Sequence, residues 1–150
     1  MKKRNILGQS LVEVVLALGL ITLIMVTVVA AASISITNSS FSKNQTLSTR
    51  LSETTLEWLR GERNENWENF LFQALSEGTE QTRCFTTLSW ENSKLGNCGS
   101  AEYISDTFLK REVDFYLVNE SAVGVTVRIY WIDAGGYHEV SSSTYLTNWY

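Results

Sequence analysis

Residues 14–36, V-V-L-A-L-G-L-I-T-L-I-M-V-T-V-V-A-A-A-S-I-S-I, decide the fold because they contain no charged residue and consist mostly of Val, Leu, Ile and Ala. As an α-helix this run would be about 35 Å long at ~1.5 Å per residue. That length crosses a hydrocarbon core of ~30 Å with some tilt. The apolar part of a secretory signal has only ~7–15 residues. The run therefore favours a retained membrane span, and a cleaved signal is the alternative because residues 30–32 are small alanines.

Charge is distributed unevenly on the two sides of this run. Lys2, Lys3 and Arg4 form a positive cluster that favours a cytoplasmic N-terminus. Beyond residue 8, nine basic residues stand against sixteen acidic ones, a side-chain charge of −7. Phosphate binding needs clustered Lys and Arg, so we expect no direct nucleic-acid partner.

The residues that lead into the apolar run, G-Q-S-L-V-E at positions 8–13, resemble the processing site of type IV prepilins and pseudopilins. The family pattern is a short basic leader, a Gly, a junction residue, a small polar residue, two apolar residues and a Glu, followed directly by an apolar helix. The resemblance covers about the first 35 residues. The chain departs from the pattern at Gln9, where the family usually has an aromatic residue, most often Phe.

The resemblance implies a specific maturation. A prepilin peptidase would cut between Gly8 and Gln9 and remove the leader, residues 1–8. The Gln9 amine would then be N-methylated. Because the cleaved bond precedes the apolar helix, the mature protein would keep its membrane anchor.

The resemblance also divides the mature chain and assigns a role to one carboxylate. Residues 9–36 would form the membrane-spanning and filament-core helix, and residues 37–150 the head outside the membrane, including the C-terminal half of the long helix. Glu13 would pair with the amino terminus of a neighbouring subunit. Among packed apolar helices, a carboxylate near an ammonium gains far more than in water. An unpaired Glu13 would penalise subunits in the wrong register.

The helix is expected to continue beyond the membrane. Residues 41–60 contain no Gly or Pro, and an apolar stripe recurs there at helical spacing: Leu47, Leu51, Thr55 and Trp58. Gly61 is a predicted stop signal. We therefore expect one helix over about residues 9–60 and a short second helix over 64–75, whose Trp67 and Phe70 would pack in the head.

The C-terminal third is predicted to be β-structure. Alternating apolar residues indicate three sequential strands within 107–118, 123–132 and 137–147, an antiparallel meander with one apolar face. Residues 82–90 are predicted to form an edge strand or loop, and 92–99 a loop. The 41–60 half of the long helix would cover the sheet. The predicted fold class is α+β, a long N-terminal helix packed on a small antiparallel sheet.

The chain has only two cysteines and one histidine, which limits the metal and redox sites that it can form. With the head outside the membrane, Cys84 and Cys98 are expected to form a disulfide that closes a 15-residue loop, worth ~3 kcal/mol in the chain-entropy model; the alternative is two free thiols. Their spacing excludes a CxxC redox site. His138 has no nucleophile pattern near it. We predict no catalytic residue, cofactor or metal.

The resulting prediction is a structural subunit, a minor pilin or pseudopilin of a type IV pilus or of a related secretion or competence filament. It would lie in the inner membrane with its N-terminus cytoplasmic and then in a surface or periplasmic filament. Its partners would be other pilin subunits, the prepilin peptidase, the inner-membrane assembly platform and, before assembly, membrane lipid.

Three alternatives remain open at this stage. The first is an unprocessed single-span membrane protein with an extracytoplasmic binding head. The second is a tight-adherence pseudopilin, which the absence of a Pro after Glu13 disfavours, and the third is a secreted enzyme, for which no catalytic constellation is visible. The aromatic residues Tyr145, Trp149 and Tyr150 fit either a partner-binding edge or sheet packing.

Overall fold

The computed structural model of this chain describes residues 11–76 and 78–148. The elements are α1 Leu11–Glu65, α2 Trp67–Ala74, β1 Glu80–Phe85, β2 Ser93–Leu95, β3 Lys110–Asn119, β4 Ala122–Asp133 and β5 Gly136–Thr147. They fall into two compact units, which divide between Lys43 and Asn44. Of the described residues, the first unit holds only the part of α1 up to Lys43, and the second, called the head below, holds the rest of α1 and all the other elements. The α+β class is confirmed.

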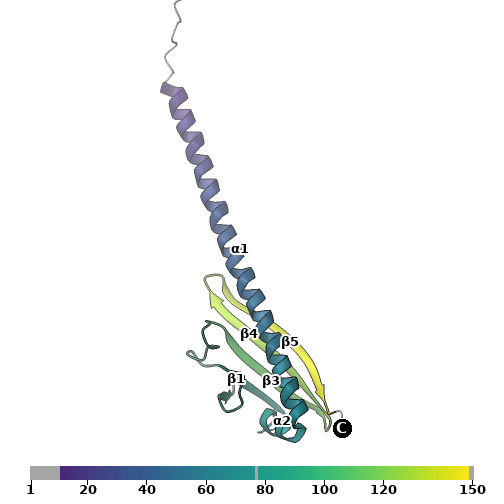
Figure 1. Cartoon of the computed structure of the whole chain (residues 1–150). Coiled ribbons are helices and arrows are strands. Elements are labelled where there is room, and N and C mark those ends of the chain that lie inside the picture. Colours follow the sequence, from purple (N-terminus) through teal and green to yellow (C-terminus); the bar gives the residue numbers. More distant parts are fainter. Residues whose placement is uncertain (1–10, 77, 149–150) are drawn as a thin grey trace, which may run out of the picture. The chain divides into compact units, whose positions relative to one another are not determined.

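The head is built on one antiparallel sheet of strand order β2-β1-β3-β4-β5. The predicted meander of three strands is confirmed as β3-β4-β5, and β4 pairs with β5 from Ala122↔Thr147 to Asp133↔Gly136 around a two-residue turn. Figure 1 shows the C-terminal part of α1 running across this sheet, with α2 at its end.

The prediction for residues 82–99 is corrected. Strand β1 is not an edge, because it lies between β2 and β3 in the sheet. The edge is β2, a three-residue strand inside the segment expected to be a loop. The alternation is weak in β1 because polar residues occupy both of its faces. Thr82, on one face, donates to Asp114 at 2.6 Å, and Arg83, on the other, is buried.

The predicted stop at Gly61 is wrong. Helix α1 continues through Gly61 to Glu65, and Asn66 then caps α2 by accepting a hydrogen bond from the Asn69 amide at 2.9 Å. A helical glycine costs only ~1 kcal/mol, which tertiary contacts can offset. Here Glu62 accepts from Trp90 Nε1 at 2.7 Å and Arg63 donates to the Thr147 carbonyl at 3.0 Å, so both hold the last turn.

The face of α1 that packs on the sheet is rotated from the predicted stripe. Its buried residues are Ser48, Ser52, Thr55, Leu56 and Leu59. Of the predicted stripe, Thr55 is buried as expected, whereas Leu47, Leu51 and Trp58 are only partly buried at the border. Small side chains at the centre let a helix approach a sheet closely. The apolar spacing therefore predicted correctly that this helix covers the sheet, but it placed the middle of the packed face on the wrong residues.

A single apolar core joins the helices to the inner face of the sheet. Alternate residues of β4 are at most 2% exposed and supply most of the sheet's contribution: Val123, Val125, Val127, Ile129 and Trp131. The predicted packing of Phe70 in this core is confirmed, and Trp67 packs against it while partly buried. The Trp90 ring lies 5.6 Å from the Phe85 ring and 5.1 Å from the Trp58 ring, which ties the β1–β2 connection to α1.

A buried cation lies between α1 and the sheet. Arg111 of β3 is 3% exposed and donates to the Phe85 carbonyl at 3.2 Å and to Thr55 Oγ1 at 3.1 Å. Thr55 Oγ1 in turn donates to the Leu51 carbonyl at 2.6 Å. Desolvation by burial lowers the pKa of Arg111 to about 10. This chain of hydrogen bonds fixes where along the helix the sheet is docked.

Two hydroxyls beside this network lack partners. Ser48 Oγ and Ser52 Oγ are buried, and neither has a hydrogen-bond partner among the residues the structure describes. An unsatisfied buried polar group costs ~1–3 kcal/mol. The α1 face therefore contains both a satisfied hydroxyl, on Thr55, and two unsatisfied ones.

Removing the hydroxyl of Ser52 and removing that of Thr55, one helical turn apart, should change the free energy of unfolding in opposite directions. Ser52→Ala should raise the free energy of unfolding by about 1 kcal/mol, because it removes a polar atom without a partner. Thr55→Val keeps the side-chain shape but takes an acceptor from Arg111, and it should lower the free energy by ~1–3 kcal/mol. Thermal unfolding of the detergent-solubilised full chain measures both. Equal shifts in the same direction would contradict this assignment.

Candidate functional site

The first unit of the chain is an apolar helix with no buried side chain. Every residue from 11 to 43 is exposed, including 16 large aliphatic residues between Leu11 and Ile36. These side chains cover all sides of the helix and not one stripe. A helix that is apolar all round needs a membrane or other helices around it. The segment is long and apolar enough to cross a bilayer, and none of it is buried within the chain.

Three threonine hydroxyls of this segment donate to backbone carbonyls of the helix itself. Thr22 Oγ1 donates to the Gly19 carbonyl at 2.9 Å, and Thr27 Oγ1 donates to the Ile24 carbonyl at 2.8 Å. Thr37 does the same to the Ser33 carbonyl at 3.1 Å. Lipid offers no hydrogen bonds to such groups, so this internal pairing is what an apolar surrounding requires.

Glu13 is the one charged side chain in the first 32 described residues, 11–42. It lies in the first turn of α1, where the positive end of the helix dipole favours a carboxylate. Within the described residues it has neither a hydrogen bond nor an ion pair. Gly8 and Gln9, the predicted processing site and methylated residue, lie outside the described residues, as do Lys2, Lys3 and Arg4.

The predicted disulfide is confirmed. Cys84 of β1 and Cys98 are bonded, with their Cα atoms 5.0 Å apart, and no cysteine is free. The Cys98 amide also donates to Glu112 Oε1 at 2.8 Å. The disulfide ties the segment after β2 to β1, and the hydrogen bond ties it to β3. The carboxylate of Glu102 lies near the two sulfurs, but sulfurs joined in a disulfide are not thiolate ligands for a metal.

The outer face of the sheet, opposite α1, carries an ion-pair network. Arg128 of β4 contacts Asp114 at 2.8 Å and Glu112 at 3.1 Å, and Tyr130 donates to Glu112 at 2.8 Å. Burial lowers the pKa of Arg128, but the hydrogen bond and charge of Asp114, with the charges of Glu112 and Glu139, outweigh burial and raise it. Burial and the Glu112 hydrogen bond likewise raise the pKa of Tyr130. The network joins β3 to β4.

The contacts of His138 are with residues at the β4–β5 turn. It lies in β5, its ring stacks on Trp131 with centroids 5.2 Å apart, and its Nε2 is 2.9 Å from Asp133 Oδ1. Asp133 Oδ1 also accepts from the Gly135 amide at 2.7 Å. Together these contacts order the β4–β5 turn.

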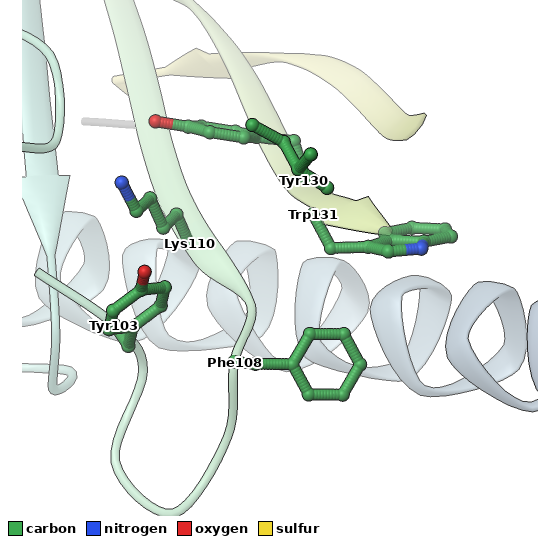
Figure 2. A pocket seen from close by; sticks show the side chains of 6 residues that line it. Tyr103, Phe108, Lys110, Tyr130 and Trp131 are labelled. Atoms are coloured by element: carbon green, nitrogen blue, oxygen red, sulfur yellow. The ribbon is translucent and has the colours of Figure 1, made fainter. Parts of the chain in front are cut away.

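One pocket of the head was missed by sequence reasoning. It lies where β3 begins and β4 ends, has a volume of about 130 Å³, and is lined by Tyr103, Phe108, Lys110, Tyr130, Trp131 and Ile132. Figure 2 shows Tyr103 and Lys110 on one side of it and Phe108 and Trp131 on the other. Lys110 is placed beside Tyr130 only by strand register. No motif links these positions in sequence, so only the pairing of β3 with β4 reveals them.

No protein-family model, no curated protein and no solved structure matches this chain.

Proposed function

We propose that this chain is a structural subunit, of the minor type, of a type IV pilus or a related secretion or competence filament. The observation that carries the proposal is the apolar part of helix α1, residues 11–36, which is exposed on all sides and whose only acid, Glu13, lies in the first turn. The G-Q-S-L-V-E motif overlaps that turn. A helix of this kind serves first as a membrane anchor and then as the core of a bundle of like helices.

Processing would supply Glu13, which has no ion-pair partner among residues 11–76 and 78–148, with a cationic partner. Cleavage between Gly8 and Gln9 creates an α-amino group four residues before Glu13. In a helix bundle of low dielectric, Glu13 of one subunit and the amine of another attract strongly. The same pairing would disfavour subunits in the wrong register, a role documented for buried polar groups in other helix assemblies.

Features of the head support an extracytoplasmic location. The Cys84–Cys98 disulfide is the kind of bond that persists in oxidising compartments. The basic residues 2–4 favour a cytoplasmic N-terminus, so one crossing by residues 14–36 carries the head outward. The proposed partners are other pilin subunits, the prepilin peptidase, the inner-membrane assembly platform and membrane lipid.

The alternative function is an unprocessed single-span membrane protein with a binding head. It is supported by the same apolar helix together with the aromatic pocket of the head. The two functions differ in the fate of residues 1–8, which the anchored binding protein keeps and the pilin loses.

The processing site gives the first test of this proposal. Full-length protein co-expressed with a prepilin peptidase should yield a mature N-terminus at Gln9 by mass spectrometry, with or without one methyl group. Gly8→Val should block the cleavage, because a side chain then stands at the scissile bond. Gly19→Val is the matched control, because a Cβ there meets no atom within 4 Å, and it should be processed normally. Residues 1–8 retained in the presence of active peptidase would contradict the pilin proposal.

The carboxylate of Glu13 gives the second test of this proposal. Glu13→Ala and Glu13→Gln should both be processed but should enter filaments at least about tenfold less, because each loses the charge that meets the new amine. Glu53→Gln is the control, a neutralised exposed acid in the head half of α1. Incorporation is measured as variant protein in sheared filaments against membrane protein. Wild-type incorporation of Glu13→Ala would overturn the assigned role.

A further inference from the structure

The two edges of the head sheet differ in length and in protection. Strand β2 ends the sheet on one side with only three residues, one of which is Lys94. Strand β5 ends it on the other side with twelve residues, and Figure 1 shows it in yellow at the margin of the sheet. Edge strands present unpaired amides and carbonyls, which proteins usually shield by short strand length, Lys, Pro, a bulge or a covering element.

The shielding features that act within a strand are absent from β5. The strand contains no Lys, and the whole chain contains no Pro. Its pairing with β4 runs without a register shift from Ala122↔Thr147 to Asp133↔Gly136, whereas the pairing of β3 with β4 is irregular near Asn119. The edge of β5 is therefore a regular template for another strand.

The backbone groups at this edge follow from the pairing with β4. The Asn148 amide donates to the Ser121 carbonyl at 2.9 Å, so these two residues form a hydrogen-bonded pair in the register of β4 and β5. In an antiparallel ladder such pairs alternate with pairs whose amides and carbonyls point outward. The residues of β5 whose backbone groups point away from β4 are therefore Tyr137, Glu139, Ser141, Ser143, Tyr145 and Thr147.

In the part of the chain that the structure describes, this edge is covered at one end only. Arg63 donates to the Thr147 carbonyl at 3.0 Å. From Tyr137 to Tyr145 the outward amides and carbonyls have no hydrogen-bond partner among the described residues. This open stretch covers eight residue steps, about 26 Å at ~3.3 Å per step. Backbone groups of this kind are satisfied by another extended backbone.

The side chains along the open stretch indicate which strand fits. On the outer face, Tyr137 and Tyr145 are 57% and 64% exposed and lie at its two ends, with Ser141 and Ser143 between them. Aromatic rings pair favourably with β-branched residues across strands, and like charges directly opposite each other are unfavourable. Glu139 is the only acid of β5, so a strand that fits has no acid opposite it and has β-branched residues opposite the tyrosines.

We propose that β5 accepts an extended segment of a different protein as an additional antiparallel strand, about nine residues long, poor in acids and rich in β-branched residues. The antiparallel direction continues the rest of the sheet and is slightly more stable per residue than the parallel one. Backbone hydrogen bonds supply the affinity of such a contact, and alternate side chains supply its selectivity. The edge belongs to the head alone, so this contact goes beyond the proposed function.

Charge favours a different protein over a second copy of this chain. Beyond residue 8, nine basic residues stand against sixteen acidic ones, a side-chain charge of −7. Two such heads brought together along β5 repel each other, whereas a segment that is poor in acids and carries a basic residue is attracted.

A synthetic peptide tests this pairing on the detergent-solubilised full chain. The probe, acetyl-V-T-T-V-T-V-K-T-V-amide, places Val opposite both tyrosines and Lys opposite Glu139 in the antiparallel register. At about ten times its dissociation constant it should slow hydrogen exchange of the outward amides of β5 by roughly tenfold. The intervening amides, which already bond to β4, should not change. The matched control is the same peptide N-methylated at the alternate residues that face β5, which removes its donors and should remove the protection.

Changes at Ser141 distinguish edge pairing from misfolding. Ser141→Pro removes one outward amide at a position where an edge strand tolerates Pro, so protection of the other outward amides by the peptide should fall several-fold while β4 keeps its own protection. Ser141→Thr keeps the amide and should respond like the wild-type chain.

Three results would overturn the proposal. The first is equal protection, or none, with the plain and the N-methylated peptide. The second is an equal response of Ser141→Pro and Ser141→Thr. The third is protection of the same outward amides that rises with protein concentration in the absence of peptide, because the occupant would then be a second copy of this chain.

Discussion

The structure depends on one imbalance, an apolar surface that its own chain does not cover. Sixteen large aliphatic side chains between Leu11 and Ile36 are exposed, and each is worth ~1.5–3 kcal/mol on burial. Their sum exceeds the net stability of a typical domain, ~5–15 kcal/mol. Burial of these side chains in lipid or against other helices would therefore be strongly favourable. The helix is long and apolar enough to cross a membrane, and the proposed function starts from this property.

Helix α1 carries two different surface patterns along one continuous backbone. Up to Ile36 it is apolar on every side, and from Ser48 onward it has a single packed face against the sheet. That face is small and partly polar at its centre, where Thr55 meets the buried Arg111. The hydrogen bonds there give the docking a defined register, whereas the surrounding leucines and Trp58 supply most of the apolar contact.

The parts of the fold that follow from a strong periodic pattern were predictable from sequence. The unbroken apolar run gave the long helix, and the alternation of Val and Ile in β4 gave the central strand of the meander. The disulfide was predicted from its expected compartment. The end of α1 was not predictable, because Gly61 is a local stop signal that the contacts of Glu62 and Arg63 override. Those contacts come from residues far away in the chain.

Three further features could not be predicted because each depends on contacts between elements that are distant in the sequence. The packed face of α1 centres on Ser48 and Ser52, which no hydrophobicity pattern selects. The interior position of β1 depends on pairing with β3 on one side and β2 on the other. The pocket brings Lys110 to Ile132 through strand register alone. Of the candidate site, the sequence supplied the motif around Gly8 and Glu13 but none of the residues of the head pocket.

Hydrogen exchange of the full chain in lipid vesicles tests the central claim most directly. Amides of residues 14–36 should be protected in vesicles as strongly as those of β4, because lipid surrounds that helix on all sides. The apolar helix and the head should then differ in their response to removal of the lipid: residues 14–36 should lose protection or aggregate, whereas β3 to β5 should keep theirs. Rapid exchange across residues 14–36 in the vesicle-bound chain, with the head intact, would contradict the account.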